Sequence, residues 1–244
     1  MGITADMKMA ELILLDIQLL AVMQRLEIPL GVRDKTVREI CEENGVDIQF
    51  FLQLANSYRD KDYFPKDHFI TFPVEWIIKY LRNSHKCYIE HRIPVIERQI
   101  IELEDDIAMQ SNSELLLNFF REYIKEFNTH IELEEKVVFP YILEIDQCIK
   151  EEILTSNYKS QFTGYHIDDY VEAHNDIEEK LYDLKNILIK YMPPPDNNCK
   201  YNTLIFDLFR LEKDLQDHSD LEDKVLIPKV HMMEKKLKNL KMER

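Results

Sequence analysis

Glycine is scarce in this sequence of 244 residues, which contains only four. Proteins built from β-strands need glycine-containing turns between short segments of alternating hydrophobicity. Such segments are missing, and Leu, Ile, Glu and Lys instead follow one another in long stretches. The sequence therefore predicts an all-α fold.

Cysteines in disulfide or metal-binding spacing are also missing. The four cysteines, Cys41, Cys87, Cys148 and Cys199, include no Cys-x-x-Cys pair, and we expect no signal peptide ahead of them. Disulfide frameworks are typical of secreted domains, and cysteine-type zinc sites need closely spaced pairs. The pattern argues against both and predicts a cytoplasmic location.

Positive charge and long apolar runs are the remaining shortages. Acidic residues outnumber basic residues by 46 to 31, for a formal net charge of -15, and only the last stretch, KKLKNLKMER, is basic. A phosphate backbone would be repelled by such a chain, so we expect no nucleic-acid partner. The most apolar early stretch, ELILLDIQLLAVM, is short and contains Asp16 and Gln18, so we expect no membrane partner either.

The first 70 residues have the pattern of a small helical domain. Turn and cap residues separate three expected helices: Leu12 to Arg25, TVREICEEN ended by Gly45, and IQFFLQLANSY capped by Asp47. The stretch DYFPKDHFITFP, with Pro65 and Pro73, then interrupts the helical pattern. We therefore expect a small N-terminal helical domain over 1–70 and a second domain over 71–244.

The second domain has the pattern of an antiparallel four-helix bundle. Apolar residues at helical spacing predict four long helices, at 74–108, 113–149, 165–191 and 201–240. Helices of similar length joined by shorter connections usually pack antiparallel. Pro94, Pro140 and Pro228 fall within these patterns, and we expect each to kink or end its helix.

One motif occurs twice in the predicted bundle. The stretch HIELEEKVVFP starts at His130, and the similar HSDLEDKVLIP starts at His218. Residues four apart share one face of a helix, so His130 lies beside Glu134 and His218 lies beside Glu222. A single pair of this kind is usually an exposed contact, but two copies in register favour two arms of one metal site.

Two further histidines complete the repeat. His85 precedes His130 by 45 residues, and His174 precedes His218 by 44, whereas the neighbouring His91 does not keep this spacing. Each helix of the bundle would then carry one histidine at nearly the same level. Four imidazoles and two carboxylates are too many for one metal ion with an open position, but they suit two ions bridged by the two glutamates.

The ligand types narrow the choice of metal. Imidazole and carboxylate without thiolate favour iron, manganese or zinc over copper(I) or an iron–sulfur cluster. The ferritin-like sites use Glu-x-x-His, whereas this chain has His-x-x-x-Glu and more histidine. Glu135 and Asp223, which directly follow the two glutamates, are expected on the surface or in support of a ligand.

The order of His85, HIELE, EAHND and HSDLE along the chain resembles the hemerythrin-like di-iron domain. Over nearly its whole length, the chain more closely resembles a narrower family, the repair of iron centres family. The stretch RLEIPLGVRDKTVREICEENGVDIQFFLQL resembles the N-terminal domain of that family. The loop PPPDNNCKYNTL before the last helix also fits.

This resemblance implies a cytoplasmic stress-response protein with two non-haem iron ions, bridged by carboxylates, in a hemerythrin-like bundle. The implied ligands are His85, His130, Glu134, His174, His218 and Glu222, and iron is favoured over manganese and zinc. Its implied partners are iron–sulfur proteins whose clusters nitric oxide or peroxide has damaged. The chain departs from the family at Ile28 to Gly31, where adjacent cysteines are usual, and at Ala173, where glutamate is frequent.

Other functions stay open at this point. The site suits small diatomic ligands, so the protein is alternatively a hemerythrin-like binder or sensor of dioxygen or nitric oxide, or a di-iron nitric oxide reductase. An oxygen carrier has five histidines and unequal irons, whereas the halves here are alike. A structural or zinc-binding bundle is a third alternative. The sequence leaves the reductant, the client protein and a homodimeric state undecided.

Overall fold

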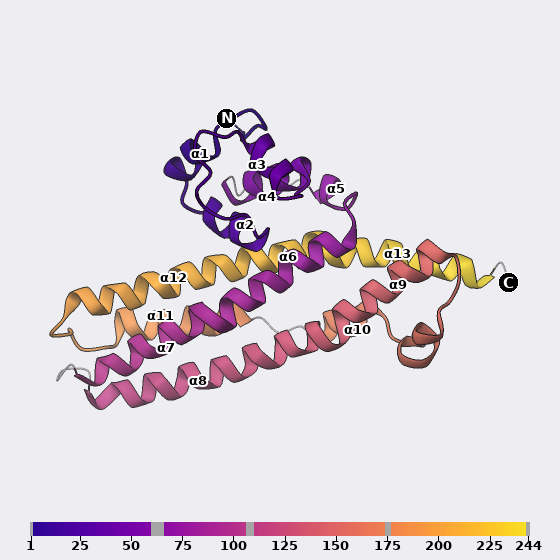
Figure 1. Ribbon diagram of the computed structural model, residues 1–244. Coiled ribbons are helices and arrows are strands. Elements are labelled where there is room, and N and C mark those ends of the chain that lie inside the picture. Colours follow the sequence, from indigo (N-terminus) through magenta and orange to yellow (C-terminus); the bar gives the residue numbers. More distant parts are fainter. Residues whose placement is uncertain (1, 60–65, 106–109, 174–176, 243–244) are drawn as a thin grey trace. The chain divides into compact units, whose positions relative to one another are not determined.

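The computed structural model describes residues 2–59, 66–105, 110–173 and 177–242. Every regular element of these residues is a helix, and a single β-bridge joins Lys8 to Thr36. The described chain is thus all-α, as its shortage of glycine and its helical periodicity predict (Figure 1).

Contacts within the chain group it into two compact units. The first consists of Met1–Ser84 and Leu221–Lys229, and the second of His85–Asp220 and Val230–Arg244. Helix α6 (Val74–Cys87) continues from one unit into the other. The division into domains 1–70 and 71–244 stays a prediction.

Five short helices form most of the first unit: α1 (Met9–Leu15), α2 (Leu19–Arg25), α3 (Val37–Glu43), α4 (Ile48–Arg59) and α5 (Lys66–Phe69). The single helix expected from Leu12 to Arg25 is wrong, because the chain leaves α1 at Asp16, whose backbone is extended. The Asp16 carboxylate accepts the Gln18 N–H at 3.0 Å. A short acidic side chain that bonds to a nearby backbone N–H competes with the helix in this way.

Side chains cap the start of two helices in this unit, and the cap at Asp47 was predicted. Asp47 accepts the Phe50 N–H at 2.8 Å and caps α4. Thr36 accepts the Glu39 N–H at 3.3 Å, while Glu39 accepts the Thr36 N–H at 2.7 Å, which makes a reciprocal capping box at the start of α3. The backbone hydrogen bond from Thr36 lowers the pKa of the Glu39 carboxyl.

Replacing Thr36 by Ala is expected to lower the free energy of unfolding by about 1 kcal/mol, because a backbone N–H at the start of α3 loses its acceptor. Urea unfolding checks this, followed by the fluorescence of Trp76, the one tryptophan of the chain, which lies in the first unit. Thr36→Ser keeps the hydroxyl and is expected to retain the stability. Equal losses in both variants would contradict the capping account.

Helices form the second unit, in which α7, α8, α11 and α12 alternate in direction and α9 and α13 continue the lines of α8 and α12 (Figure 1). They are α7 (Ile93–Ile101), α8 (Gln110–Leu133), α9 (Phe139–Glu151), α10 (Ile167–Ala173), α11 (Ile177–Lys190), α12 (Asn198–Leu221) and α13 (Ile227–Met242). The core draws on α7, α8, α11 and α12, with fully buried side chains such as Ile100, Phe120, Leu184 and Leu208. Removing this apolar surface from water is the main force that holds the bundle together.

The three prolines do not end their helices, and the kinks expected at them stay a prediction. Each proline lies six residues after the start of a π-helical turn: η1 (Tyr88–Arg92), η3 (Glu134–Val138) and η5 (Glu222–Leu226). The residue before each proline donates its N–H to the carbonyl five residues back, at Tyr88, Glu134 and Glu222. A proline ring clashes with the carbonyl four residues before it in a regular helix. The wider turn lets the helix continue past the proline.

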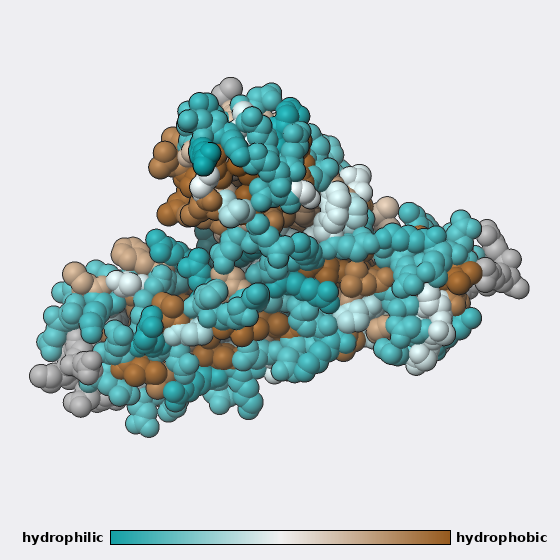
Figure 2. Space-filling view, viewed as in Figure 1, coloured by the Kyte–Doolittle hydropathy of each residue, from teal (hydrophilic) through white to brown (hydrophobic). Residues whose placement is uncertain are grey.

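None of the helices in the described part of the chain is long and apolar enough to cross a membrane. Figure 2 shows a mainly hydrophilic surface over the long helices and a hydrophobic area over α1 and α2. Leu14 and Leu15 at the end of α1 are 87% and 78% exposed, and Ile17 in the turn that follows is 69% exposed.

Candidate metal centre

Polar residues at or just beyond the ends of α6, α8 and α12 meet at one buried place in the second unit. His85 lies in the last turn of α6, His130 lies near the end of α8 and is followed by Glu134 at the start of η3, and His218 lies near the end of α12. His85, Glu134 and His218 are at most 5% exposed. Burying such groups is costly unless they bond to one another or to a metal.

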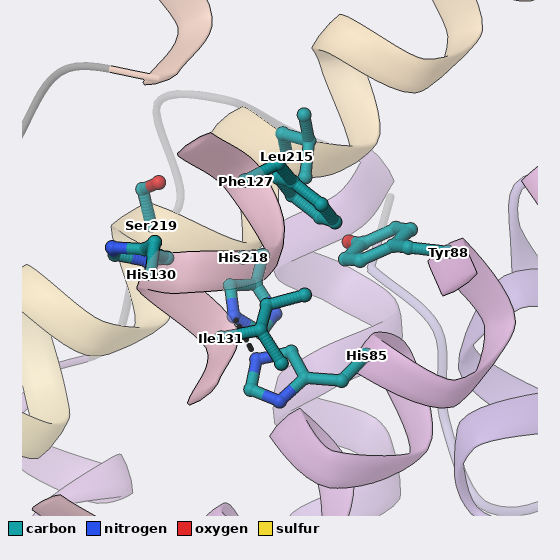
Figure 3. Close-up of a pocket in the computed structure, with 8 residues that line it drawn as sticks. All are labelled: His85, Tyr88, Phe127, His130, Ile131, Leu215, His218 and Ser219. Atoms are coloured by element: carbon teal, nitrogen blue, oxygen red, sulfur yellow. Dashed lines mark hydrogen bonds between the residues drawn. The ribbon is translucent and has the colours of Figure 1, made fainter. Parts of the chain in front are cut away.

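The Glu134 carboxylate lies between two imidazoles from different helices. Its Oε2 atom is 3.0 Å from His85 Nε2, and its Oε1 atom is 2.9 Å from His130 Nε2. His85 Nε2 is also 3.1 Å from His218 Nε2 (Figure 3). Each carboxylate oxygen thus faces a different histidine, and a third histidine adjoins one of them.

This donor set fits a transition metal. One donor atom from each of His85, Glu134 and His218 lies within 4.8 Å of the other two. Metals bind imidazole nitrogen and carboxylate oxygen at about 2.0–2.2 Å, so the donors around one ion lie roughly 3–4 Å apart. The three side chains therefore need little movement to surround an ion.

Hydrogen bonding keeps the Glu134 carboxylate in its charged form. Burial acts to raise its pKa, but hydrogen bonds from His130 and His85 outweigh burial and hold the pKa well below 4.5. For His85, burial acts to lower the pKa, and hydrogen bonds to Glu134 and Glu135 outweigh it and raise the pKa. An anionic carboxylate beside imidazoles is the form that binds a cation.

Two more side chains hold these groups in place. Glu135 Oε1 is 2.9 Å from His85 Nδ1, so a carboxylate orients the imidazole from the ring nitrogen that faces away from Glu134. Supporting carboxylates of this kind fix the ring orientation of metal-binding histidines. Tyr170 on α10 donates its hydroxyl to Glu134 Oε1 at 2.5 Å. Sequence reasoning missed Tyr170, although it precedes His174 by the same four-residue step that links His130 to Glu134.

Two further residues, Glu222 and His174, were predicted as ligands. Glu222 is 1% exposed, and it follows His218 by about one turn of a continuous helix, which puts both on the same helix face. His174 lies outside the described residues. His91, which the sequence excluded as a ligand, is exposed.

A small cavity adjoins the histidines. Its volume is about 20 Å³, and its lining includes His85 and His218 together with the apolar side chains of Phe127, Ile131 and Leu215. Figure 3 shows Phe127, Leu215 and Tyr88 gathered beside the two imidazole rings. One water molecule needs roughly 10–15 Å³ by this kind of measure, so the space suits one very small molecule.

The fold and the site define a helical-bundle metal-binding protein. The family model of the hemerythrin HHE cation-binding domain matches residues 77–230, more than half of the chain. The chain therefore belongs to the hemerythrin HHE cation-binding family. A comparison with curated proteins gave no match.

Proposed function

We propose that this chain is a non-haem di-iron protein that helps to restore damaged iron–sulfur clusters in the cytoplasm. The observation that carries the di-metal part is the position of Glu134, whose two oxygens face His85 and His130 separately. A carboxylate that presents one oxygen to each of two histidines is placed to bridge two ions. The imidazoles of His85 and His218 would hold one ion, because their Nε2 atoms are neighbours.

His130 would hold the second ion together with His174, and Glu222 would supply the second bridging carboxylate. This assignment follows the repeated spacing of the two His-x-x-x-Glu motifs. Glu135 would orient His85, and Tyr170 would orient Glu134. When bound, two iron ions with open positions supply redox and small-ligand chemistry that the side chains lack.

The repair role is supported by the resemblance of both the N-terminal helices and the bundle to the repair of iron centres family. Its clients would be iron–sulfur proteins damaged by nitric oxide or peroxide. The segment where that family usually has adjacent cysteines is instead irregular here and bends at Leu30, with Gly31 at φ +93° and Leu30 68% exposed. Repair by this chain would therefore depend on the metal centre and not on thiols of that segment.

A second candidate function is the binding or reduction of a small diatomic molecule such as dioxygen or nitric oxide. The cavity of about 20 Å³ beside His85 and His218 favours it, since the cavity has room for little else. Binding and cluster repair would use the same metal centre. Sustained consumption of nitric oxide with a reductant would support the reductase, whereas a stable, reversible oxygenated spectrum would support a carrier.

Elemental analysis of protein purified without added metal and without air tests the proposal. We expect about two iron ions per chain and oxo-bridge absorption bands after oxidation. Reactivation of an iron–sulfur enzyme whose cluster has been damaged by nitric oxide then tests the repair role, with metal-free protein as the control. Zinc, or no bound metal, would contradict the redox function and leave a structural bundle.

A further inference from the structure

Two neighbouring helices of the second unit expose large apolar side chains. On α11, Tyr182 and Ile189 are 57% and 56% exposed. On α12, Phe206 and Phe209 are 65% and 47% exposed. Spacings of seven and three residues put each pair on one face of its helix. These four side chains are called the α11–α12 patch below.

Lys185 joins the two helices beneath this patch. Its Nζ atom lies 5.8 Å from the ring centroid of Tyr182 and 4.0 Å from that of Phe209, and it forms an ion pair with Glu212 on α12. Lys185 is 4% exposed. A cation against the face of a ring attracts the ring and holds it in place. An aromatic side chain that is already held loses little freedom when a partner covers it.

The size of the patch matches what a dimer interface needs. An aromatic side chain has about 150–250 Å² of surface to bury, so at these exposures the three rings leave about 250–400 Å² in solvent. Ile189 adds to this area. A standard interface takes about 800 Å² from each partner, and somewhat more than half of it is apolar. The patch therefore supplies most of the apolar part of an interface of ordinary size.

Charges of both signs border the patch. On α12, Arg210 pairs with Asp207 at 3.6 Å, and on α11, Asp183 and Lys190 are exposed. In a two-fold dimer each patch meets a copy of itself, so a border of one sign would set like charges against each other. The mixed border avoids this repulsion, although the whole chain has a formal net charge of -15. The charge pattern thus suits a second copy of this chain.

From these features we infer that the α11–α12 patch is the interface of a two-fold homodimer, in which the patch of one copy packs against the same patch of another. The patch lies wholly in the second unit, and the inference does not rest on the proposed metal chemistry. Because the interface is of ordinary size at most, we expect the dimer to form reversibly.

Sedimentation equilibrium of the full chain at several protein concentrations tests this inference. We expect a monomer–dimer equilibrium without larger species, since a two-fold interface is closed. Phe206→Asp is expected to raise the dissociation constant of the dimer at least about 30-fold, because an interface aromatic worth a factor of about five or more is lost from both copies. Ile189→Asp makes the same test on the other helix. Both side chains are more than half exposed, and circular dichroism checks that the helices persist.

Leu14→Asp is the matched control. It adds the same charge at a side chain that is 87% exposed in the first unit, and it is expected to leave the dissociation constant unchanged. A chain that stays monomeric at every concentration would overturn the inference, as would a dimer that persists in both patch variants. Loss of the dimer in Leu14→Asp would also overturn it and would place the interface at the apolar area of α1. Growth beyond the dimer with concentration would contradict the two-fold arrangement.

Discussion

A chain that carries both His85→Ala and His218→Ala is expected to lose more than about 100-fold in metal affinity, since even supporting residues of metal sites are worth about 10–100-fold. The two imidazoles meet at 3.1 Å between their Nε2 atoms, so their removal takes away adjacent donors from two helices. Metal content after purification, followed by competition with a chelator, measures the loss. Circular dichroism reports whether the helices persist.

His91→Ala is the control for this double variant. His91 lies in η1, six residues after His85, but it is exposed and outside the cluster. Its replacement is expected to leave both metal content and affinity unchanged. A double variant that folds and still binds metal as tightly as the unmodified chain would refute the assignment of His85 and His218 as ligands.

Local features of the fold could be predicted from the sequence because short-range chemistry decides them. The all-α fold could be predicted from two features, the scarcity of glycine and the helical spacing of the apolar residues. The Asp47 cap could be predicted from residue type alone. The break at Asp16 was missed because apolar periodicity continues across it from α1 to α2. A single side-chain hydrogen bond to the Gln18 N–H competes with that periodicity.

The π turns show where helical periodicity gives only part of the answer. The repeated motif correctly puts His130 beside Glu134, since the regular part of α8 ends at Leu133. Glu134 then opens the wider turn before Pro140, and the inserted residue rotates the rest of the helix by about 100° relative to a regular one. Glu134 is therefore the last residue of this helix that the i, i+4 rule places on the same face as the residue four positions earlier.

The helix formed by α6, η1 and α7 has the same π turn, but the turn begins with a tyrosine and not with a glutamate. Tyr88 begins η1 six residues before Pro94, as Glu134 does before Pro140. The histidine of this helix, His85, lies three residues before the turn instead of four. The repeat of the two motifs predicts His85, but it does not predict that Tyr88 takes the place of a glutamate at the start of the turn. The wider turn depends on a shift in backbone hydrogen bonding that residue spacing alone does not reveal.

Contacts between helices were the least predictable part of the site. Tyr170 and Glu134 are 36 residues apart, and their hydrogen bond depends on how α10 is rotated toward η3. Glu135 was expected on the surface or in support of a ligand, and its side chain is in fact 31% exposed while it bonds to His85. Sequence spacing identifies which residues share one helix face, whereas packing of apolar side chains decides which faces meet.

Tyr170→Phe is expected to lower metal affinity about 10-fold or more while leaving the bundle folded. The ring keeps its buried place, but Glu134 Oε1 loses the hydroxyl that fixes it at 2.5 Å. The carboxylate then has more freedom to leave the position that suits a bridge between two ions. Chelator competition measures the affinity, and urea unfolding of metal-free protein measures any general loss of stability.

Tyr182→Phe provides the matched control, since Tyr182 lies on α11 and is 57% exposed. It is expected to change neither metal affinity nor stability. If Tyr170→Phe lowered the stability of the metal-free protein without changing the affinity, Tyr170 would be a packing residue only. A fall in affinity at unchanged stability is the result that identifies Tyr170 as the residue that positions Glu134 for the metal.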